Sequence, residues 1–424
     1  MGDVPLRELP PPGVGHEVAW VAEHLGHLAG RPVVAAPGFR GGRSAAVAAL
    51  GRLDVTGYAR RRNEVWPAAR QGATRLGPWI RHGLLTLREV WDRVEGGPAR
   101  DVGKFRDELL WQEYARHLTA RLGGRTARPL RAAPEVDERA PDPWDDARPG
   151  GGTLPCVGEA LRQLREEGWV VNQARMWLAS QWTVRGHRRW TEGEDEMFRH
   201  LLDGSRAANR LGWQWTTGAG NGRPYGFSRQ QVERRAPGLC STCDLRDHCP
   251  VEAWPEVELV PVEPPSRLRR DPDPVRTAGP STPERNGAAP SAVWITAESL
   301  GDVDPALTAH PGLPVVFVFD EPLLVRLRLA GHRLVFLAEC LADLSVRREL
   351  RVVLGDPVGA LRDGGPLATT FTPVPGGRAR RAALGPVVAD LHPWPWLVPP
   401  HAGRAGSFSA WRRHLPASAA GSPG

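Results

Sequence analysis

The sequence predicts a multidomain protein in which an all-helical N-terminal domain, residues 1–255, precedes a C-terminal parallel α/β domain, residues 291–424. Up to residue 255, apolar side chains recur at helical spacing with little strand-like alternation. Residues 256–290 are rich in proline, arginine and serine, which predicts a disordered linker. After the linker, short apolar runs alternate with a helical run, as in a parallel sheet. A chain of 424 residues is long enough for two or three domains.

Individual segments carry these patterns. The helical spacing is clearest in "KFRDELLWQEYARHLTARL" (104–122) and "GEALRQLREEGWVVNQARMWLASQWTV" (158–184). In the last domain, "AVWITA", "LPVVFVFD" and "LRVVLGD" are strand-like, and residues 324–350, between the last two, are helical. We therefore expect a Rossmann-like C-terminal domain.

The charge balance is basic. The net charge is +7, the sequence pI is about 9.8, and Lys104 is the only lysine beside the arginines. An arginine excess fits a polyanionic partner, and codon bias in a GC-rich genome explains it equally well. No apolar run is long enough to cross a membrane and the start lacks a signal-peptide pattern. We expect a cytoplasmic monomer without a membrane partner.

The cysteines form a separate pattern. "CSTCDLRDHC" (240–249) has the spacing C-x2-C-x5-C and is followed by Pro250. Clustered thiolates bind zinc or an iron–sulfur cluster, and zinc usually needs a second tight pair of cysteines or histidines. We expect a [4Fe–4S] cluster, with zinc or no metal as alternatives. The expected ligands are Cys156, Cys240, Cys243 and Cys249, and Cys340 and His248 are the alternatives to Cys156.

A series of motifs runs in order along residues 39–215. They begin in "GFRGGRSAAVAALGRLDVTGYARRRN" and continue through "GATRLGPWIRHGLLTLREVW", "FRDELLWQEYARHL", "GEALRQLREEGWVVNQARM" and "WTEGEDEMFRHLLDGSRAANRLGWQW". This ordered series resembles the flavin-binding domain of the DNA photolyase/cryptochrome family. The cysteine pattern resembles the bacterial iron–sulfur branch of that family, although its x5 spacing is shorter than usual there. "NQARM" (172–176) instead resembles the pyrimidine-dimer branch.

The resemblance implies an FAD cofactor. The residues near Tyr58 and Thr74 would hold its diphosphate, since hydroxyls and N–H groups at a helix start suit an anion. Asp203, fixed by Arg175, would bond the ribose or the flavin edge, and Asn209 would face flavin N5. The complete expected cofactor set is Tyr58, Thr74, Arg75, Leu76, Phe105, Arg175, Asp203, Ser205 and Asn209.

The resemblance also implies a second group of residues that act on DNA and carry electrons. A pocket for a flipped pyrimidine dimer needs stacking surface and polar groups for the base edges. The expected residues are Glu108, Trp111, Asn172 and Met176 for the dimer, and Trp213 followed by Trp190 for electron transfer. Each also has an ordinary interpretation, as a core indole, a surface charge or a structural ion pair. Their joint order favours the functional one.

Some features depart from the family pattern. Ser205 stands where a second aspartate is usual, Phe105 where a DNA-stacking tryptophan is common, and Gly77 where the phosphate loop has its second serine. The α/β domain, which resembles the one that normally begins a photolyase, comes last. We interpret this order as a circular permutation, with a tandem of unrelated halves as the alternative. An antenna chromophore in this domain is an open question.

The expected function is light-driven repair, in which reduced FAD gives an electron to a flipped dimer in UV-damaged DNA. Two alternatives remain. A cryptochrome-like photoreceptor would use the flavin and the tryptophans without repair, and an iron–sulfur DNA-binding module would lack flavin. The motif series between residues 58 and 215 has no explanation under the latter. Whether the lesion is a cyclobutane dimer or a (6-4) product is not encoded in these motifs.

Overall fold

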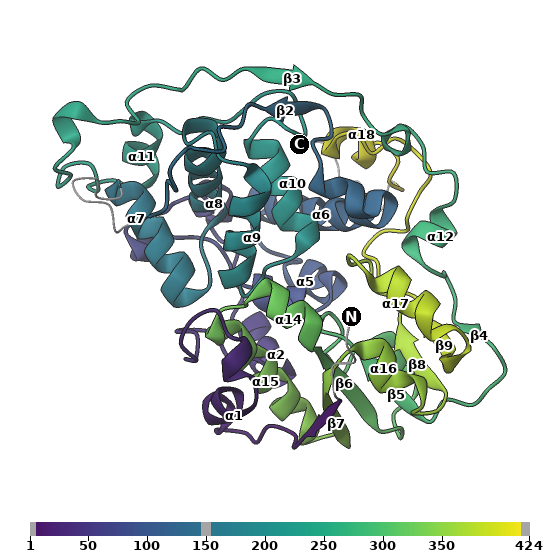
Figure 1. Ribbon diagram of the computed structural model, residues 1–424. Helices are drawn as coiled ribbons and strands as arrows, with labels where there is room; N and C mark the ends of the chain where they lie inside the picture. Colours follow the sequence, from purple (N-terminus) through teal and green to yellow (C-terminus); the bar gives the residue numbers. More distant parts are fainter. Residues whose placement is uncertain (1–5, 146–153, 417–424) are drawn as a thin grey trace.

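The computed structural model describes residues 6–145 and 154–416 and divides into a helical part and an α/β part (Figure 1). Both predicted architectures are present. None of the described helices is both long and apolar enough to span a membrane. The helical part contains α2 (Arg43–Gly51), α3 (Tyr58–Arg61), α4 (Gly77–Arg81), α5 (Leu87–Arg93), α6 (Ala99–Leu122), α7 (Pro155–Arg162), α8 (Asn172–Ala179), α9 (Trp190–His200), α10 (Arg206–Thr216) and α11 (Arg229–Arg235).

The α/β part is a seven-stranded sheet whose five inner strands are parallel. In spatial order the strands are β1 (Arg7–Leu9), β7 (Leu350–Gly355), β6 (Val315–Asp320), β5 (Ala292–Ile295), β8 (Leu367–Thr370), β9 (Val388–His392) and β4 (Glu284–Arg285). Its helices are α1 (Glu17–Leu25), α13 (Pro305–Ala309), α14 (Glu321–Leu327), α15 (Gly331–Ser345), α16 (Pro357–Arg362) and α17 (Gly377–Leu384). The first parallel strand, β5, lies at the centre, and the chain winds outward in both directions, as in Rossmann-like folds.

The sheet is covered on both faces, which explains why its strands are continuous apolar runs. Side chains alternate along a strand, so neighbouring residues face opposite sides. Phe317 and Phe319 belong to the same core cluster as Phe336 of α15, whereas Val316 and Val318 pack with residues of α16 and α17. Parallel sheets buried in this way show little polar alternation.

The predicted helical run 158–184 is interrupted in the structure. Gly168 adopts a left-handed conformation with φ 67°, and residues 169–171 are extended before α8 begins at Asn172. Gly168 tolerates this conformation because it lacks a Cβ. The break turns the chain inward, so that Trp169 and Arg175 face one cavity.

Residues 7–9 belong to the sheet, which corrects the expectation that residues 1–255 are all helical. β1 pairs antiparallel with β7, and α1 packs against α15. The strand supplies hydrogen-bond partners to an edge that would otherwise be open. The expected division at residue 255 therefore does not separate the two parts cleanly.

Residues 256–290, predicted to be a disordered linker, contain short elements that contact other parts of the structure. β3 (Leu259–Pro261) pairs with β2 (Ala132–Pro134), α12 (Pro274–Ala278) packs against α6, and β4 pairs with β9. Within this segment the carboxylate of Asp271 is buried and accepts a hydrogen bond from the hydroxyl of Thr277. The linker thus runs along both parts of the molecule (Figure 1).

The end of the chain returns to the helical part, where α18 (Phe408–Arg412) packs against α6. Glu113 of α6 is fully buried and its carboxylate accepts the backbone N–H groups of Leu397 and Val398. The indole of Trp411 donates to His117 over 3.1 Å. These contacts attach the last described residues of the α/β part to the longest helix.

We expect Glu113 to make stability fall as pH rises. Burial raises the pKa of Glu113 from 4.5 to about 7. Between these values the folded chain keeps a proton that the unfolded chain has lost, so this group lowers the free energy of unfolding by about 3 kcal/mol across the window. Glu113→Gln keeps an acceptor oxygen but does not titrate. Urea unfolding at pH 4.5 and pH 7.5 should show the variant gaining stability relative to wild type by that amount.

An exposed carboxylate provides the control for this experiment. Glu23 is 75% exposed, and Glu23→Gln should follow the pH dependence of the wild-type protein. Parallel stability curves for wild type and Glu113→Gln would contradict the argument.

Candidate functional site

Residues from most of the predicted motifs line one cavity of about 230 Å³ in the helical part. Its walls come from the segment before α4 and from α6, α8 and α10, which lie far apart in the sequence. The predicted residues on its lining are Tyr58, Thr74, Arg75, Leu76, Glu108, Trp111, Asn172, Arg175, Met176, Asp203, Ser205, Asn209 and Trp213. Phe105 and Trp190 are buried elsewhere.

An ion pair between Arg175 and Asp203 anchors the cavity. Arg175 donates to one carboxylate oxygen of Asp203 over 2.7 Å and to the carbonyl of Val170 over 2.9 Å. The other oxygen of Asp203, Oδ1, is buried without a hydrogen-bond partner among the described residues. A buried acceptor without a partner is costly. It therefore marks a place where a polar ligand group would bind.

Gly77 approaches Asp203 so closely that a larger residue does not fit. A Cβ at Gly77 would lie 2.5 Å from Oδ2 of Asp203. The serine that the motif resemblance leads one to expect at this position would displace the carboxylate in this chain. The departure at Gly77 is therefore matched to the position of Asp203.

The side chain of Asn209 is oriented by Glu194. Its amide nitrogen donates to a carboxylate oxygen of Glu194 over 2.9 Å and to the carbonyl of Glu194 over 3.2 Å. Glu194 is buried and also pairs with Arg206 and Arg210. Because the amide nitrogen is engaged, the amide oxygen of Asn209 is the group that can accept a hydrogen bond from a ligand. Sequence reasoning missed Glu194, whose signal was an acidic residue on the buried face of α9.

The residues predicted to bind the phosphates, Arg75 and Tyr58, have different surroundings. The guanidinium of Arg75 lies over the rings of Phe39 at 4.7 Å and Trp169 at 4.5 Å. The pKa of Tyr58 is raised because the phenol is buried, so the hydroxyl stays neutral. Phe105 packs edge-on against Tyr58 at 5.1 Å and so supports the cavity wall instead of lining it.

Ser205 begins α10. Its hydroxyl accepts the backbone N–H of Ala207 over 3.3 Å, as an N-cap residue does. The position where the family usually has a second aspartate therefore serves the helix start here. Its side chain still borders the cavity.

The predicted dimer-binding residues line the same cavity. Glu108 pairs with Lys104 at 2.8 Å and with Arg62 at 3.2 Å. The amide of Asn172 lies 3.8 Å from the sulfur of Met176. Glu108 is thus neutralised by two cations at a partly exposed position. Sequence reasoning did not identify Arg62, which also lines the cavity.

A tryptophan outside the predicted set, Trp144, has its ring next to that of Trp213. Trp144 lies 6.1 Å from Trp213 between ring centroids, and Trp182 lies 4.7 Å from Trp144. Trp190 makes no such ring contact in the described part of the chain. Trp144 follows a proline-rich loop, "APDPW", and nothing in that loop indicated a position beside the cavity. The relay role of Trp190 stays a prediction.

The four predicted metal-ligating cysteines line a second, small cavity of about 20 Å³. Cys156 is at the start of α7, and the other three follow α11. Cys340 is buried in α15 and His248 is not on this lining, so the structure favours Cys156 among the three candidates for the fourth ligand. Arg229 borders the cavity, and Arg185 donates to the carbonyl of Pro250 over 3.1 Å.

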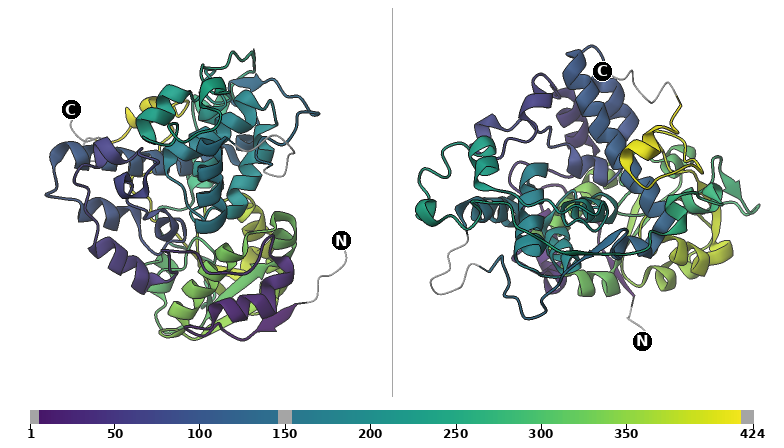
Figure 2. Two further views of the ribbon diagram at one scale, coloured as in Figure 1. Left: turned by 90° about the vertical axis from the view of Figure 1, so that its left-hand side faces the viewer. Right: turned by 90° about the horizontal axis from the view of Figure 1, so that it is seen from above.

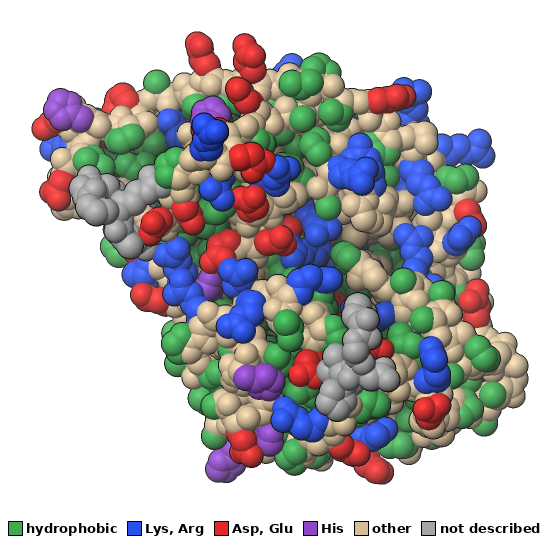
Figure 3. Space-filling model, in the orientation of Figure 1, with side chains coloured by type: hydrophobic (Ala, Val, Ile, Leu, Met, Phe, Trp, Pro, Cys, Tyr) green, Lys and Arg blue, Asp and Glu red, His purple; other side chains and the backbone are tan. Residues whose placement is uncertain are grey.

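A third cavity, of about 600 Å³, lies between the two parts of the molecule. It is bordered by the ends of β5 and β6 and by α9 and α10, and eight arginines line it: Arg81, Arg116, Arg199, Arg206, Arg210, Arg326, Arg333 and Arg380. Basic side chains gather along the hollow between the two parts in Figure 3. The ends of parallel strands are the usual place for a ligand in such folds.

Residues 105–232 match the family model described as the FAD binding domain of DNA photolyase. The matched residues are thus similar to the flavin-binding domain of that family, and the cavity bordered by Asp203 and Asn209 lies largely within them.

Curated relatives show the same similarity over part of the chain. The chain is 36% identical to the deoxyribodipyrimidine photo-lyase of Thermus thermophilus over 37% of this chain and 38% of the relative. It is 32% identical to that of Vibrio cholerae over 37% of this chain and 35% of the relative. The matches thus span less than two fifths of these relatives. A solved archaeal photolyase from Sulfolobus tokodaii with two FAD molecules aligns at 23% identity and a TM-score of 0.41, covering 53% of this chain and 55% of that one.

Substitution of Gly77 tests the construction of this site. We expect Gly77→Ser to lower the amount of FAD retained after gel filtration, because the new Cβ would push Asp203 away from Arg175. The measurement is FAD released by acid per chain. Gly51→Ser is the matched control, since nothing lies within 4 Å of its added Cβ. Equal FAD content in all three proteins would show that Asp203 does not hold the cofactor.

Proposed function

We propose that the protein is a FAD-dependent, light-driven DNA repair enzyme of the deoxyribodipyrimidine photo-lyase type. The observation that carries the proposal is the shared cavity. It joins the expected flavin contacts, such as Asp203 and Asn209, to the expected dimer contacts, Glu108 and Trp111. A repair enzyme of this type needs both sets within reach of each other, because an electron must pass between cofactor and lesion.

The residues on the cofactor side fit a flavin nucleotide. Asp203 offers an oriented carboxylate with a free oxygen, and Asn209 offers an amide oxygen as an acceptor. Bound FAD, when reduced and excited, supplies the electron that opens the dimer. The protein's share is to bind and orient the cofactor and to limit water around it. An acceptor fixed by Glu194 favours a protonated ring nitrogen at the place that Asn209 faces.

The residues expected to bind the lesion fit a flipped pyrimidine dimer. Trp111 offers a flat apolar surface on which a base can stack. Glu108 offers carboxylate oxygens to the base edges, and Arg62 and Lys104 orient its side chain. The arginine-rich composition supplies further phosphate contacts, which are sensitive to salt. UV-damaged DNA is thus the proposed substrate.

The cysteine cavity is proposed to hold a [4Fe–4S] cluster. Four thiols from two distant segments line it. Their sulfur atoms do not all lie within 4.8 Å of one another, since the only described group that meets this distance is at another site. Zinc would draw four sulfur atoms to about 4 Å from one another, whereas a cluster places them farther apart. Arg185 and Arg229 provide positive charge beside an anionic cluster. The cluster would join α7 to the segment after α11, a structural role.

The 600 Å³ cavity is the proposed place for an antenna chromophore. Its eight arginines favour an anionic molecule, and its apolar walls include Trp294 and Phe317. It lies between the α/β part and α10, so a pigment there would be near the flavin domain.

A photoreceptor without repair activity is the second candidate. The observation that favours it is the row of Trp213, Trp144 and Trp182, which could feed electrons to a flavin. The shared cavity still favours repair over signalling, because a photoreceptor has no need of Glu108 and Trp111 beside the flavin contacts.

Repair should be measured directly. We expect the protein with reduced FAD to restore dimer-containing DNA under blue light, and Glu108→Gln to slow repair by about tenfold or more, the usual effect of losing a hydrogen bond to a charged group. Glu95→Gln, at an exposed position, is the control. If the flavin-loaded wild type leaves dimers intact while light still reduces the flavin in a Trp213-dependent way, the photoreceptor is the correct assignment.

The cluster has its own test. Anaerobically purified protein should contain about four iron and four sulfide per chain. Cys240→Ser should lose most of both, because Cys240 is a ligand and is partly exposed, so its loss should leave the rest folded. Cys340→Ser should keep them, since Cys340 lies in α15 away from the cavity. Zinc in place of iron, without sulfide, would retire the cluster and keep the metal site.

A further inference from the structure

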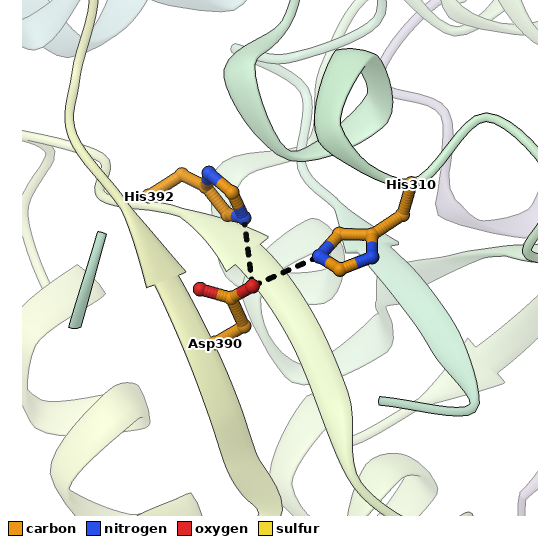
Figure 4. A group of neighbouring side chains, drawn as sticks. All are labelled: His310, Asp390 and His392. Atoms are coloured by element: carbon orange, nitrogen blue, oxygen red, sulfur yellow. Dashed lines mark hydrogen bonds and ion pairs between the residues drawn. The ribbon is translucent and has the colours of Figure 1, made fainter. Parts of the chain in front are cut away.

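A third polar group, outside the cavities described above, lies at the edge of the sheet. His310, Asp390 and His392 place their ligating atoms within 4.8 Å of one another (Figure 4). Nε2 of His310 is 2.9 Å from Oδ2 of Asp390, and Nε2 of His392 is 3.2 Å from the same oxygen. None of the three lines the flavin, cysteine or arginine-rich cavities.

The fold fixes all three side chains. Asp390 and His392 are two residues apart on β9 and therefore point to the same face of the sheet. His310 directly follows α13, and α13 is tied to β8 because Asp304 at its start accepts a hydrogen bond from Thr370 over 2.8 Å. The group is thus assembled by two secondary-structure elements from different places in the sequence.

Protein contacts alone do not satisfy this group. Asp390 and His392 are almost completely buried, and Oδ1 of Asp390 and Nε2 of His392 have no hydrogen-bond partner among the described residues. Burying an ionised carboxylate and leaving polar atoms unpaired is costly. Nε2 of His392 faces Oδ2 of Asp390 at an ion-pair distance, and the same oxygen also faces His310, so all three ligating groups converge on one point.

We propose that His310, Asp390 and His392 form a binding site for a divalent transition-metal ion, with zinc as the preferred ion. Two imidazole nitrogens and one carboxylate oxygen are a ligand set that zinc accepts, whereas magnesium and calcium favour oxygen ligands alone. Three protein ligands leave the fourth tetrahedral position of zinc to water or a small ligand. The ion replaces the proton that joins His310 to Asp390.

Access to the site is from the side of His310 and Arg285. The side chain of His310 is 19% exposed, and Arg285 reaches Oδ2 of Asp390 at 3.4 Å while remaining 68% exposed. Arg285 is the cation that now faces the carboxylate and the competitor of a metal ion. Because most of its side chain is in solvent, it can turn away when the ion binds.

The test compares zinc content between variants. Full-length protein is incubated with excess zinc, desalted and analysed for metal per chain. Wild type and His27→Ala, which removes an exposed histidine, should hold about one zinc more than His310→Ala and Asp390→Asn. Iron or zinc held by the cysteines is the same in all four proteins. X-ray absorption at the zinc edge should then show a component with nitrogen and oxygen ligands only.

Equal zinc content in all four proteins, or zinc bound only through sulfur, overturns the proposal and leaves a hydrogen-bonded structural cluster. Circular dichroism checks that the variants fold. If a variant does not fold, the X-ray absorption of wild-type protein decides the question, since the cysteine site gives sulfur ligands and this site gives none. Loss of flavin or of repair activity has no bearing on either result.

Discussion

The cavity proposed to bind flavin depends on contacts made by the α/β part to the loop that carries Asp203. Arg333 and His332, at the start of α15, are buried and donate to the backbone carbonyls of Phe198 and His200 at the end of α9. These carbonyls would otherwise lack partners, as at any helix end. Burial lowers the pKa of His332 to about 4 and that of Arg333 to about 9. The first is therefore neutral at pH 7, and the second remains a charged donor.

From this constraint the geometry of the site follows in steps. Arg81 donates to the carbonyl of Gly204 over 2.7 Å, next to Asp203, and also pairs with Glu298 of the α/β part at 2.7 Å. With the loop held, Asp203 meets Arg175 of α8, and Gly77 can approach only because it has no side chain. The cavity is thus built in the helical part, but both parts hold it in place. A flavin domain cut out alone would lose the donors that fix this loop.

The sequence predicted those features whose signal lies within a short segment. The motif series predicted most of the cavity lining, and the apolar runs predicted the parallel strands, because both signals are contained within short segments. It was a poor guide where partners are distant. Nothing near Trp144 in the sequence indicates that it lies beside Trp213. The alternation of side chains along β9 likewise does not show that His310 reaches Asp390 from another element. The contacts of residues 256–290 could not be predicted either, since their partners, β9 and α6, are distant in the sequence.

The contacts between the two parts do not require a particular order of these parts along the chain. β1 and α1 lie with the sheet, α18 lies with α6, and the segment between β3 and β4 runs between the parts, so the chain passes from one part to the other more than once (Figure 2). The hydrogen bonds that fix the loop of Asp203, and the one from Leu397 to Glu113, join residues more than a hundred positions apart in the sequence. Such contacts do not depend on which part the chain visits first, only on both being complete. A circular permutation, which stays a prediction, would therefore have to preserve these non-local hydrogen bonds rather than any particular linker. Arg333, a donor, and Glu113, an acceptor, both lie inside helices.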